Sequence, residues 1–291
     1  MRLAVLIALA VLPAAGCNRL PKDTIVIYGR ENNSGTYMYF KEHVLNEEDF
    51  EPRVQTLPGT AAVINAVSKD RRSIGYGGIG YIKGVRTLPV RKDDVSPAVE
   101  PTIENVVKGT YPISRNLFFY TIGEPEGAVR HFIDWARSAD GQKICEAVGY
   151  YPLPDDRQSK APGPGPAGNH TITVKGSDTM VILGQRWAEQ YQRANPGVTV
   201  QITGGGSGTG IAALINGATN ICMASRHMKP KEHEQIKAKF GKGAVEFAVA
   251  MDGIAIFVNE RNALRDISVP QLKSVYTGKA REWSDLGIAL E

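Results

Sequence analysis

The chain has 291 residues, of which 42% are hydrophobic and 22% charged, and its formal net charge is +4 at pH 7. This length is sufficient for two lobes or for one large domain. The positive charge is mild and spread along the chain, whereas a protein that binds nucleic acid needs a concentrated basic face. We therefore expect a globular protein without a nucleic-acid partner.

The first residues are typical of an export signal. Met1 and Arg2 form a short basic start, residues 3–12 are an apolar run too short to span a bilayer, and small residues lead to Cys17. The pattern resembles a bacterial lipoprotein signal, in which the cysteine becomes the lipidated first residue. We expect residues 1–17 to be such a signal, with plain secretion as the alternative, and membrane association to depend on the lipid.

In the first half of the chain, strand, glycine turn and helix follow one another. The turn contains Arg30 and then Ser34, Gly35 and Thr36, so hydroxyls and backbone N–H groups precede a helix, as in oxyanion sites. Apolar periodicity predicts strands over 24–27, 73–76 and 117–120, helices over 37–44 and 61–67, and a mostly helical segment over 129–145.

Residues 159–170 are rich in proline and glycine and have no apolar periodicity. Such a segment is extended and unpacked. We expect it to be a linker that divides the mature chain into residues 22–158 and 171–291.

The second half repeats the same order of elements. Polar glycine turns follow the strands and include Ser177, Asp178 and Thr179, then Ser207, then Arg226. Ser177 or Asp178 is suited to cap the next helix. The predicted strands are 171–174, 198–202, 221–224 and 254–257, and the predicted helices are 181–191 and 211–215. This alternation predicts an α/β sheet that binds a ligand at the carboxyl ends of its strands.

The sequence gives no indication of catalysis, a metal or a cofactor. Its histidines are scattered, residues 204–210 lack the Gly-Lys-Ser/Thr ending of a phosphate-binding loop, and Ser34 has no evident base partner. Cys145 and Cys222 are able to pair in an oxidising compartment, but two small buried core residues are the favoured interpretation.

Several motifs together resemble the periplasmic phosphate-binding proteins of bacterial ABC importers, over nearly the whole mature chain. Four segments resemble the first half of the sequence of that family: residues 174–180, 204–210, 223–226 and 276–285. Residues 30–36, 74–76, 111–115 and 149–153 resemble its second half. The two halves stand here in exchanged order, so the chain resembles a circular permutant with family order 159–291 followed by 22–158.

The resemblance implies an α/β, two-lobed type II periplasmic binding protein fold, circularly permuted. One lobe would comprise residues 22–77 and 258–291 and carry Arg30. The other would comprise residues 78–158 and 171–257 and carry Thr179. Inorganic phosphate would bind in the cleft between them, and a monomer at the periplasmic or cell surface would deliver it to an ABC transporter permease.

The resemblance also implies the ligand residues: Arg30, Ser34, Gly35 and Thr36 from one lobe, and Ser177, Asp178, Thr179, Ser207 and Arg226 from the other. Arg226 departs from the family pattern, because many relatives carry an aspartate there that accepts the proton of monohydrogen phosphate. One alternative is therefore that the protein binds another tetrahedral oxyanion instead of phosphate. A second alternative, which follows because fold does not fix function, is a secreted phosphate-handling enzyme or adhesin with the same fold.

Overall fold

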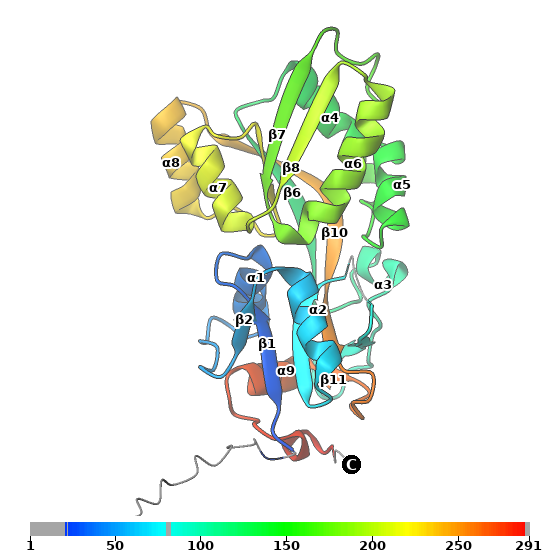
Figure 1. Cartoon of the computed structure of the whole chain (residues 1–291), viewed down its shortest axis with the longest axis vertical. Helices are drawn as coiled ribbons and strands as arrows, with labels where there is room; N and C mark the ends of the chain where they lie inside the picture. Colours follow the sequence, from blue (N-terminus) through cyan, green and yellow to red (C-terminus); the bar gives the residue numbers. More distant parts are fainter. Residues whose placement is uncertain (1–20, 22, 80–82, 289–291) are drawn as a thin grey trace, which may run out of the picture.

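The computed structural model describes residue 21 and residues 23–79 and 83–288, which form two α/β lobes joined by a continuous sheet (Figure 1). The expected signal peptide, including Cys17, lies outside the described residues. No helix in the described ranges is long and apolar enough to cross a membrane. In the same ranges, no cluster of three metal-ligating side chains is present.

The lobe that carries Arg30, here the Arg30 lobe, is built on parallel strands near the start of the chain. Its strands are β1 (Val26–Arg30), β2 (Gln55–Leu57), β3 (Ser73–Gly78) and β4 (Arg86–Leu88), with a small sheet of β5 (Val90–Arg91) and β11 (Ile267–Ser268). Its helices are α1 (Gly35–His43), α2 (Gly59–Lys69), α3 (Ile103–Val107) and α9 (Val269–Tyr276), followed by a 3-10 turn, Trp283–Leu286.

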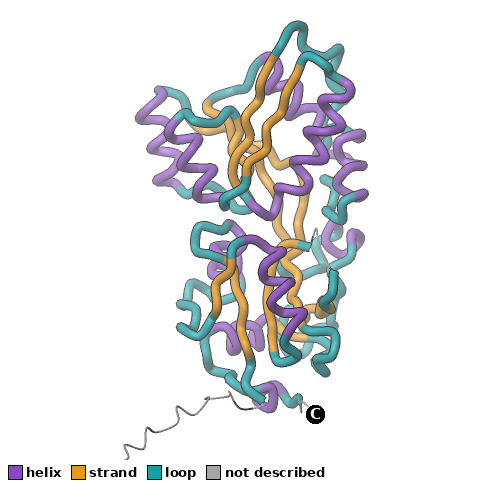
Figure 2. Tube along the Cα trace, in the orientation of Figure 1, coloured by secondary structure: helices purple, strands orange, loops and turns teal. Residues whose placement is uncertain are grey.

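The other lobe, here the Thr179 lobe, repeats this plan with helices on the sheet faces (Figure 2). Its strands are β6 (Ser114–Ile122), β7 (His170–Gly176), β8 (Val198–Thr203) and β9 (Ile221–Ala224). Its helices are α4 (Gly127–Arg137), α5 (Ala139–Ala147), α6 (Val181–Ala194), α7 (Ser207–Asn216) and α8 (Pro230–Phe240).

The long strand β10 (Ala244–Val258) connects the lobes. The sheet order is β2-β1-β3-β10-β6-β9-β7-β8, and β4 also pairs with β10. The first part of β10 pairs with β6 in the Thr179 lobe, and its last five residues pair with β3 in the Arg30 lobe. Figure 1 shows β10 as the orange strand that runs from one lobe into the other.

The lobe boundary lies elsewhere than the sequence predicts. Residues 86–88 pair with 256–258 of β10, and β5 pairs with β11, so the segment after β3 stays in the Arg30 lobe. The chain passes from the Arg30 lobe to the Thr179 lobe between Ile113 and Ser114, instead of near residue 78. The backbone N–H of Ile254 donates to the carbonyl oxygen of Ile113 at 2.8 Å there, next to the second crossing in β10.

Each lobe has its own core of buried aromatic side chains. In the Arg30 lobe, Phe40 of α1 stacks on Tyr76 of β3 with ring centroids 4.0 Å apart, and Tyr276 packs against both rings. In the Thr179 lobe, Trp187 of α6 packs edge-on against Phe119 of β6. Separate cores allow the lobes to move relative to each other about the crossings.

The linker lies on the surface, and the two cysteines are unpaired. Residues 159–170 contain no helix, and none of residues 159–169 is buried. Several contacts hold the linker. A ring nitrogen of His131 and the carbonyl oxygen of Gly163 are 3.0 Å apart, and the backbone N–H of Ser159 donates to the carbonyl oxygen of Arg137 at 2.9 Å. Cys145 and Cys222 are buried and free, so they do not form a disulfide.

Candidate oxyanion site between the lobes

The start of α1 points from the Arg30 lobe to the opposite lobe. Ser34 caps this helix, because its Oγ accepts a 3.1 Å hydrogen bond from the backbone N–H of Thr36. The next residue must be small. A Cβ atom on Gly35 would lie 2.4 Å from Oγ of Ser225 and 2.5 Å from Oγ of Ser207. Glycine therefore allows the helix start to approach the other lobe.

Five buried hydroxyls gather at this point. Oγ1 of Thr36 and Oγ1 of Thr179 are 2.9 Å apart across the cleft. On the far side, Ser177 donates to Oγ of Ser225 at 3.0 Å, and Oγ of Ser207 lies 3.3 Å from the same atom. Each of these side chains is less than a tenth exposed. Hydroxyls rotate to donate, so the cluster is a compact set of neutral donors suited to an anion.

The glycine loop before α7 also crosses the cleft. The backbone N–H of Gly208 donates to the carbonyl oxygen of Asn33 at 3.0 Å, and Nδ2 of Asn33 donates to the carbonyl oxygen of Gly205 at 3.0 Å. Gly205 and Gly206 have φ values of 116° and 90°, which favour glycine strongly. The loop thus brings the N-terminus of α7 next to that of α1.

Arg30 is a buried cation at the end of β1, with 1% of its surface exposed. Its Nε and Nη2 donate to the two carboxylate oxygens of Glu31 at 3.1 and 2.9 Å, and Nη1 donates to Oγ1 of Thr60 at 3.1 Å. Burial raises the pKa of Glu31, but the hydrogen bonds and charge of Arg30 outweigh it and hold that pKa below its ordinary value. The guanidinium is therefore fixed before a ligand arrives.

The expected helix cap by Ser177 or Asp178 is wrong. A 3-10 turn, Asp178–Met180, precedes α6, and the residue before α6 makes no side-chain cap. Ser177 bonds to Ser225 instead, while Oδ1 of Asp178 accepts from the backbone N–H of Gly205 at 2.8 Å. Oδ2 of Asp178 lies 3.6 Å from Nη2 of Arg30. Ser177 thus belongs to the hydroxyl cluster, and Asp178 holds the glycine loop before α7.

Arg226 lies apart from the hydroxyl cluster. Both of its Nη atoms contact the Glu232 carboxylate, at 2.9 and 2.8 Å. Burial raises the pKa of Glu232, but the hydrogen bond to Arg226 outweighs it, so that pKa is lower than usual. Arg226 lines a cavity of about 380 Å³ together with α1 residues and Arg115. Among the described residues, its side chain hydrogen-bonds to His227 and Glu232 and to none of the five hydroxyls.

Three residues that the sequence reasoning missed are central to the site. Ser225 joins the hydroxyls of both glycine turns. Arg115 of β6 donates from Nη2 to Oγ1 of Thr36 at 2.7 Å and to Oδ2 of Asp252 at 2.8 Å. Asp252 is the charged residue in the otherwise apolar stretch 247–258 of β10, which is the signal that would have singled it out.

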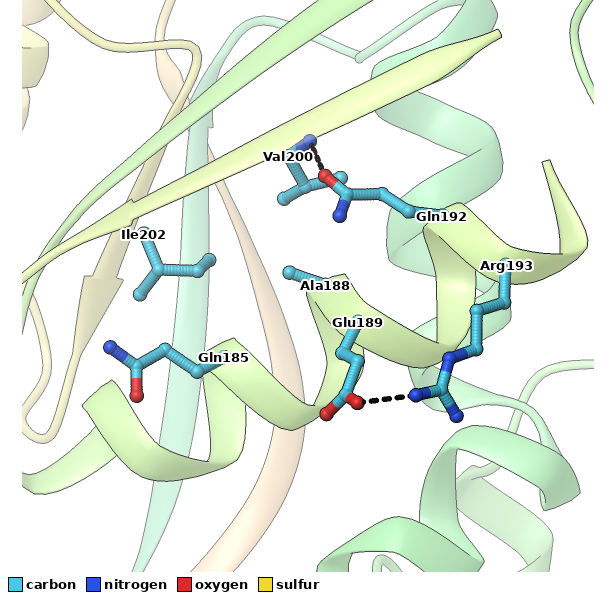
Figure 3. A pocket seen from close by; sticks show the side chains of 7 residues that line it. All are labelled: Gln185, Ala188, Glu189, Gln192, Arg193, Val200 and Ile202. Carbon is cyan, nitrogen blue, oxygen red and sulfur yellow. Dashed lines mark hydrogen bonds and ion pairs between the residues drawn. The ribbon is translucent and has the colours of Figure 1, made fainter. Parts of the chain in front are cut away.

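Another hollow, between α6 and β8, contains none of these residues (Figure 3). Its polar groups bond among themselves. Glu189 pairs with Arg193 at 2.7 Å, and Gln192 accepts from the backbone N–H of Val200. Its lining offers no convergent donors of the kind found in the cleft, so we do not regard it as an anion site.

Comparisons with known proteins agree with this architecture. A sequence model described as the PBP superfamily domain matches residues 18–140 and 161–290, on either side of the linker. The chain is 32% identical over 286 residues to "Phosphate-binding protein PstS 2" of Streptococcus agalactiae, covering 94% of this chain and 92% of that protein. It is 38% identical over 145 residues to "Phosphate-binding protein PstS" of Pseudomonas aeruginosa, covering 48% and 45%.

A solved structure is also similar. The crystal structure of a phosphate ABC transporter, phosphate-binding protein from Streptococcus pneumoniae TIGR4 superposes with a TM-score of 0.66 and 27% identity, covering 90% of this chain and 99% of that one. Sequence and fold thus agree over almost the full length of both proteins. The chain belongs to the PBP superfamily and, within it, to the family of phosphate-binding proteins.

Proposed function

We propose that this protein captures inorganic phosphate between its lobes and delivers it to the permease of an ABC importer. One observation carries the proposal. Helix N-termini and buried hydroxyls from both lobes converge between the lobes, and the buried guanidinium of Arg30 lies 3.6 Å from the carboxylate of Asp178, the residue between Ser177 and Thr179. In this proposal Ser34, Gly35, Thr36, Ser177, Thr179 and Ser207 surround the anion, and Asp178 contacts Arg30 and the glycine loop.

The physical reason is the cost of removing phosphate from water. Hydrogen bonds to a charged group contribute roughly 1.5–3 kcal/mol each, so several are needed to offset desolvation. Helix starts and glycine loops supply N–H donors with little ordering of side chains. The described residues of the cleft provide such donors but no serine–histidine pair or metal cluster. The relatives are named as binding proteins and support a carrier in preference to an enzyme.

A second ligand class, other tetrahedral oxyanions, is favoured by one observation. Arg226 occupies the position at which a proton-accepting aspartate is expected, and it is paired with Glu232. Calorimetry with phosphate, sulfate, molybdate and arsenate at several pH values decides between the classes. We expect one phosphate per chain and no turnover of a phosphomonoester. Heat with another anion but not with phosphate would contradict the phosphate assignment, and turnover would favour an enzyme.

The named relatives support a location outside the cytoplasm and a membrane permease as partner. We further propose that a lipid on Cys17 anchors the protein to the membrane and that it acts as a monomer. Mass spectrometry of the protein from membranes is expected to show a diacylglyceryl mass on Cys17. A Cys17→Ser variant should then appear in the soluble extracytoplasmic fraction or stay unprocessed.

A further inference from the structure

Arg115 and Asp252 form a buried ion pair at the junction of the lobes. They face each other in register on β6 and β10, next to the point where the chain crosses. Nε and Nη2 of Arg115 donate to Oδ2 of Asp252 at 3.1 and 2.8 Å. The two side chains are 2% and 0% exposed. A buried ion pair contributes little to stability compared with apolar residues of the same size, so its presence calls for another reason.

The pair is connected directly to the hydroxyls of the proposed anion site. Nη2 of Arg115 also donates to Oγ1 of Thr36 at 2.7 Å, and Thr36 contacts Thr179 at 2.9 Å. On the other side of Asp252, its Oδ1 accepts from the backbone N–H of Ile79 at 3.3 Å. A Cβ atom on Gly78 would come within 2.7 Å of Thr179 and 3.3 Å of Asp252, so the end of β3 is packed closely against both.

One donor of Arg115 is unused. Its Nη1 is buried and has no hydrogen-bond partner among the described residues. Leaving a charged N–H unpaired in a buried place costs free energy, and an anion placed beside it removes that cost. Arg115 also lines the cleft cavity of about 380 Å³ and lies with its guanidinium carbon 5.5 Å from the centre of the Tyr39 ring. The guanidinium thus borders both the hydroxyl cluster and the open part of the cleft.

The role of Asp252 follows from these contacts. Burial raises its pKa, while the charge of Arg115 and the hydrogen bonds from it act in the opposite direction. Its carboxylate holds the Nε edge of the guanidinium, which leaves the Nη1 side free. A fixed guanidinium loses less entropy when it binds an anion.

We propose that Arg115 is a second arginine of the oxyanion site, which binds the anion through Nη1, and that Asp252 is its positioning residue. This inference rests on the proposed function, because it assigns residues to the same site. It predicts two arginines at the anion, Arg30 fixed by Glu31 and Arg115 fixed by Asp252. The two guanidiniums come from different strands, β1 and β6. That of Arg115 bonds to Thr36 of the hydroxyl cluster, and that of Arg30 lies 3.6 Å from Asp178.

The test is calorimetry of phosphate binding with four variants. Arg115→Lys keeps the buried charge but loses the planar fork, and Arg115→Gln removes the charge. Arg115→Gln/Asp252→Asn removes both charges, which avoids an unpaired buried carboxylate. Arg137→Gln is the matched control, because the Arg137 guanidinium is half-buried in the same lobe and bonds to the carbonyl oxygens of Ala248 and Arg157. Thermal melting monitors folding.

We expect the dissociation constant to rise about 30-fold or more in Arg115→Gln and in the double variant, and less in Arg115→Lys. Arg137→Gln should bind like the wild type. If Asp252 acts only through Arg115, the double variant loses no more affinity than Arg115→Gln. A larger loss in the double variant contradicts the positioning role. A folded double variant or a folded Arg115→Lys variant with wild-type affinity overturns the proposal for Arg115.

Titration of the wild type distinguishes a failure of the proposed function from a failure of the proposal for Arg115. If the wild type binds sulfate or arsenate but not phosphate, the phosphate assignment fails and the same four variants are titrated with the anion that binds. If the wild type binds no tetrahedral oxyanion, both the function and the role of Arg115 are wrong.

Discussion

The carboxylate of Glu31 accepts two hydrogen bonds from the guanidinium of its neighbour Arg30, which is buried and lies 3.6 Å from Asp178 of the other lobe. Such an arginine presents its remaining N–H groups in a fixed direction. Arg226 has a comparable two-point contact with Glu232, but it lies away from the hydroxyl cluster. Removal of the arginine from these two similar pairs is therefore expected to affect ligand binding differently.

We predict that Arg30→Ala weakens phosphate binding by about 2–5 kcal/mol, the cost of removing a charged donor from a buried anion. Arg226→Ala should weaken it much less and should mainly lower the melting temperature. Calorimetry on both variants provides the comparison, and each serves as the control for the other. Equal affinity of the wild type and Arg30→Ala would refute the site.

Gly35 offers a second test at the scale of one atom. We predict that Gly35→Ala weakens phosphate binding about tenfold or more, because the added Cβ meets the hydroxyls of Ser207 and Ser225 and hinders closure of the lobes. The control is Gly243→Ala, since a Cβ there meets no atom within 4 Å. Wild-type affinity in Gly35→Ala would mean that α1 and α7 do not approach so closely when the anion is bound.

The sequence predicts part of this site for a physical reason. Glycine turns with hydroxyls have a local signature, so Ser34, Thr36, Thr179 and Ser207 stand out in the chain. Arg115 lies in the motif 111–115, but that motif does not indicate a ligand role, because the contact of Arg115 with Asp252 forms only when β6 and β10 pair across 137 positions of sequence. Long-range pairing brings these residues together, and a single sequence does not show it.

At the scale of elements, local apolar patterns predict β7, β8 and β9 to within two residues of their ends. The pattern fails for β10, of which only residues 254–257 are predicted. Its earlier part contains Glu246 and Asp252, whose charges interrupt the apolar pattern but are paired with Tyr120 and Arg115 in the fold. The predicted lobe boundary fails for a similar reason, since short strands such as β4 have too few residues to show a period.

The turn between β9 and α8 depends on one carboxylate. Glu232 accepts from Arg226 and from the backbone N–H of Lys229 at the start of α8. Its pKa in the fold is below the ordinary value of 4.5. A lowered folded pKa stabilises the fold above the unfolded pKa, and this contribution is lost as the pH falls through the folded pKa.

We therefore predict that Glu232→Gln lowers stability at pH 7 by about 1–2 kcal/mol, as expected for a partly exposed charge-assisted hydrogen bond. The difference from the wild type should shrink as the pH is lowered below about 4.5. Thermal melting at several pH values measures this trend, with the exposed Glu234→Gln on the same helix as control. A difference that stays constant down to pH 3 would disprove the role of this carboxylate.

At the scale of the whole molecule, both ends of the described chain lie on the Arg30 lobe (Figure 1). The backbone N–H of Trp283 donates to the carbonyl oxygen of Asp23 at 3.0 Å, and Thr24 forms a bridge with Glu282. Lys22 and Glu291 themselves lie outside the described residues. This proximity meets the geometric condition for a circular permutant, in which these ends would be joined.

The order of the two halves is therefore open to a direct test. We predict that a chain with its halves exchanged, with residue 291 joined to residue 22 and new termini between Pro166 and Ala167, keeps both lobes and their cleft. The linker contributes no buried side chain, and loop closure depends only weakly on length, so the free-energy difference between the two orders should be small.

The dissociation constant for phosphate should change by less than about threefold, which corresponds to under ~0.7 kcal/mol. A permutant opened in the glycine loop between Gly205 and Gly206 is the control, because that cut separates residues that contact Asn33 across the cleft and should abolish binding. If the exchanged chain folds but binds phosphate more than about tenfold more weakly, the two orders are not equivalent and the linker has a part in the site. If it fails to fold, the ends near Asp23 and Trp283 are not a neutral place to join the halves.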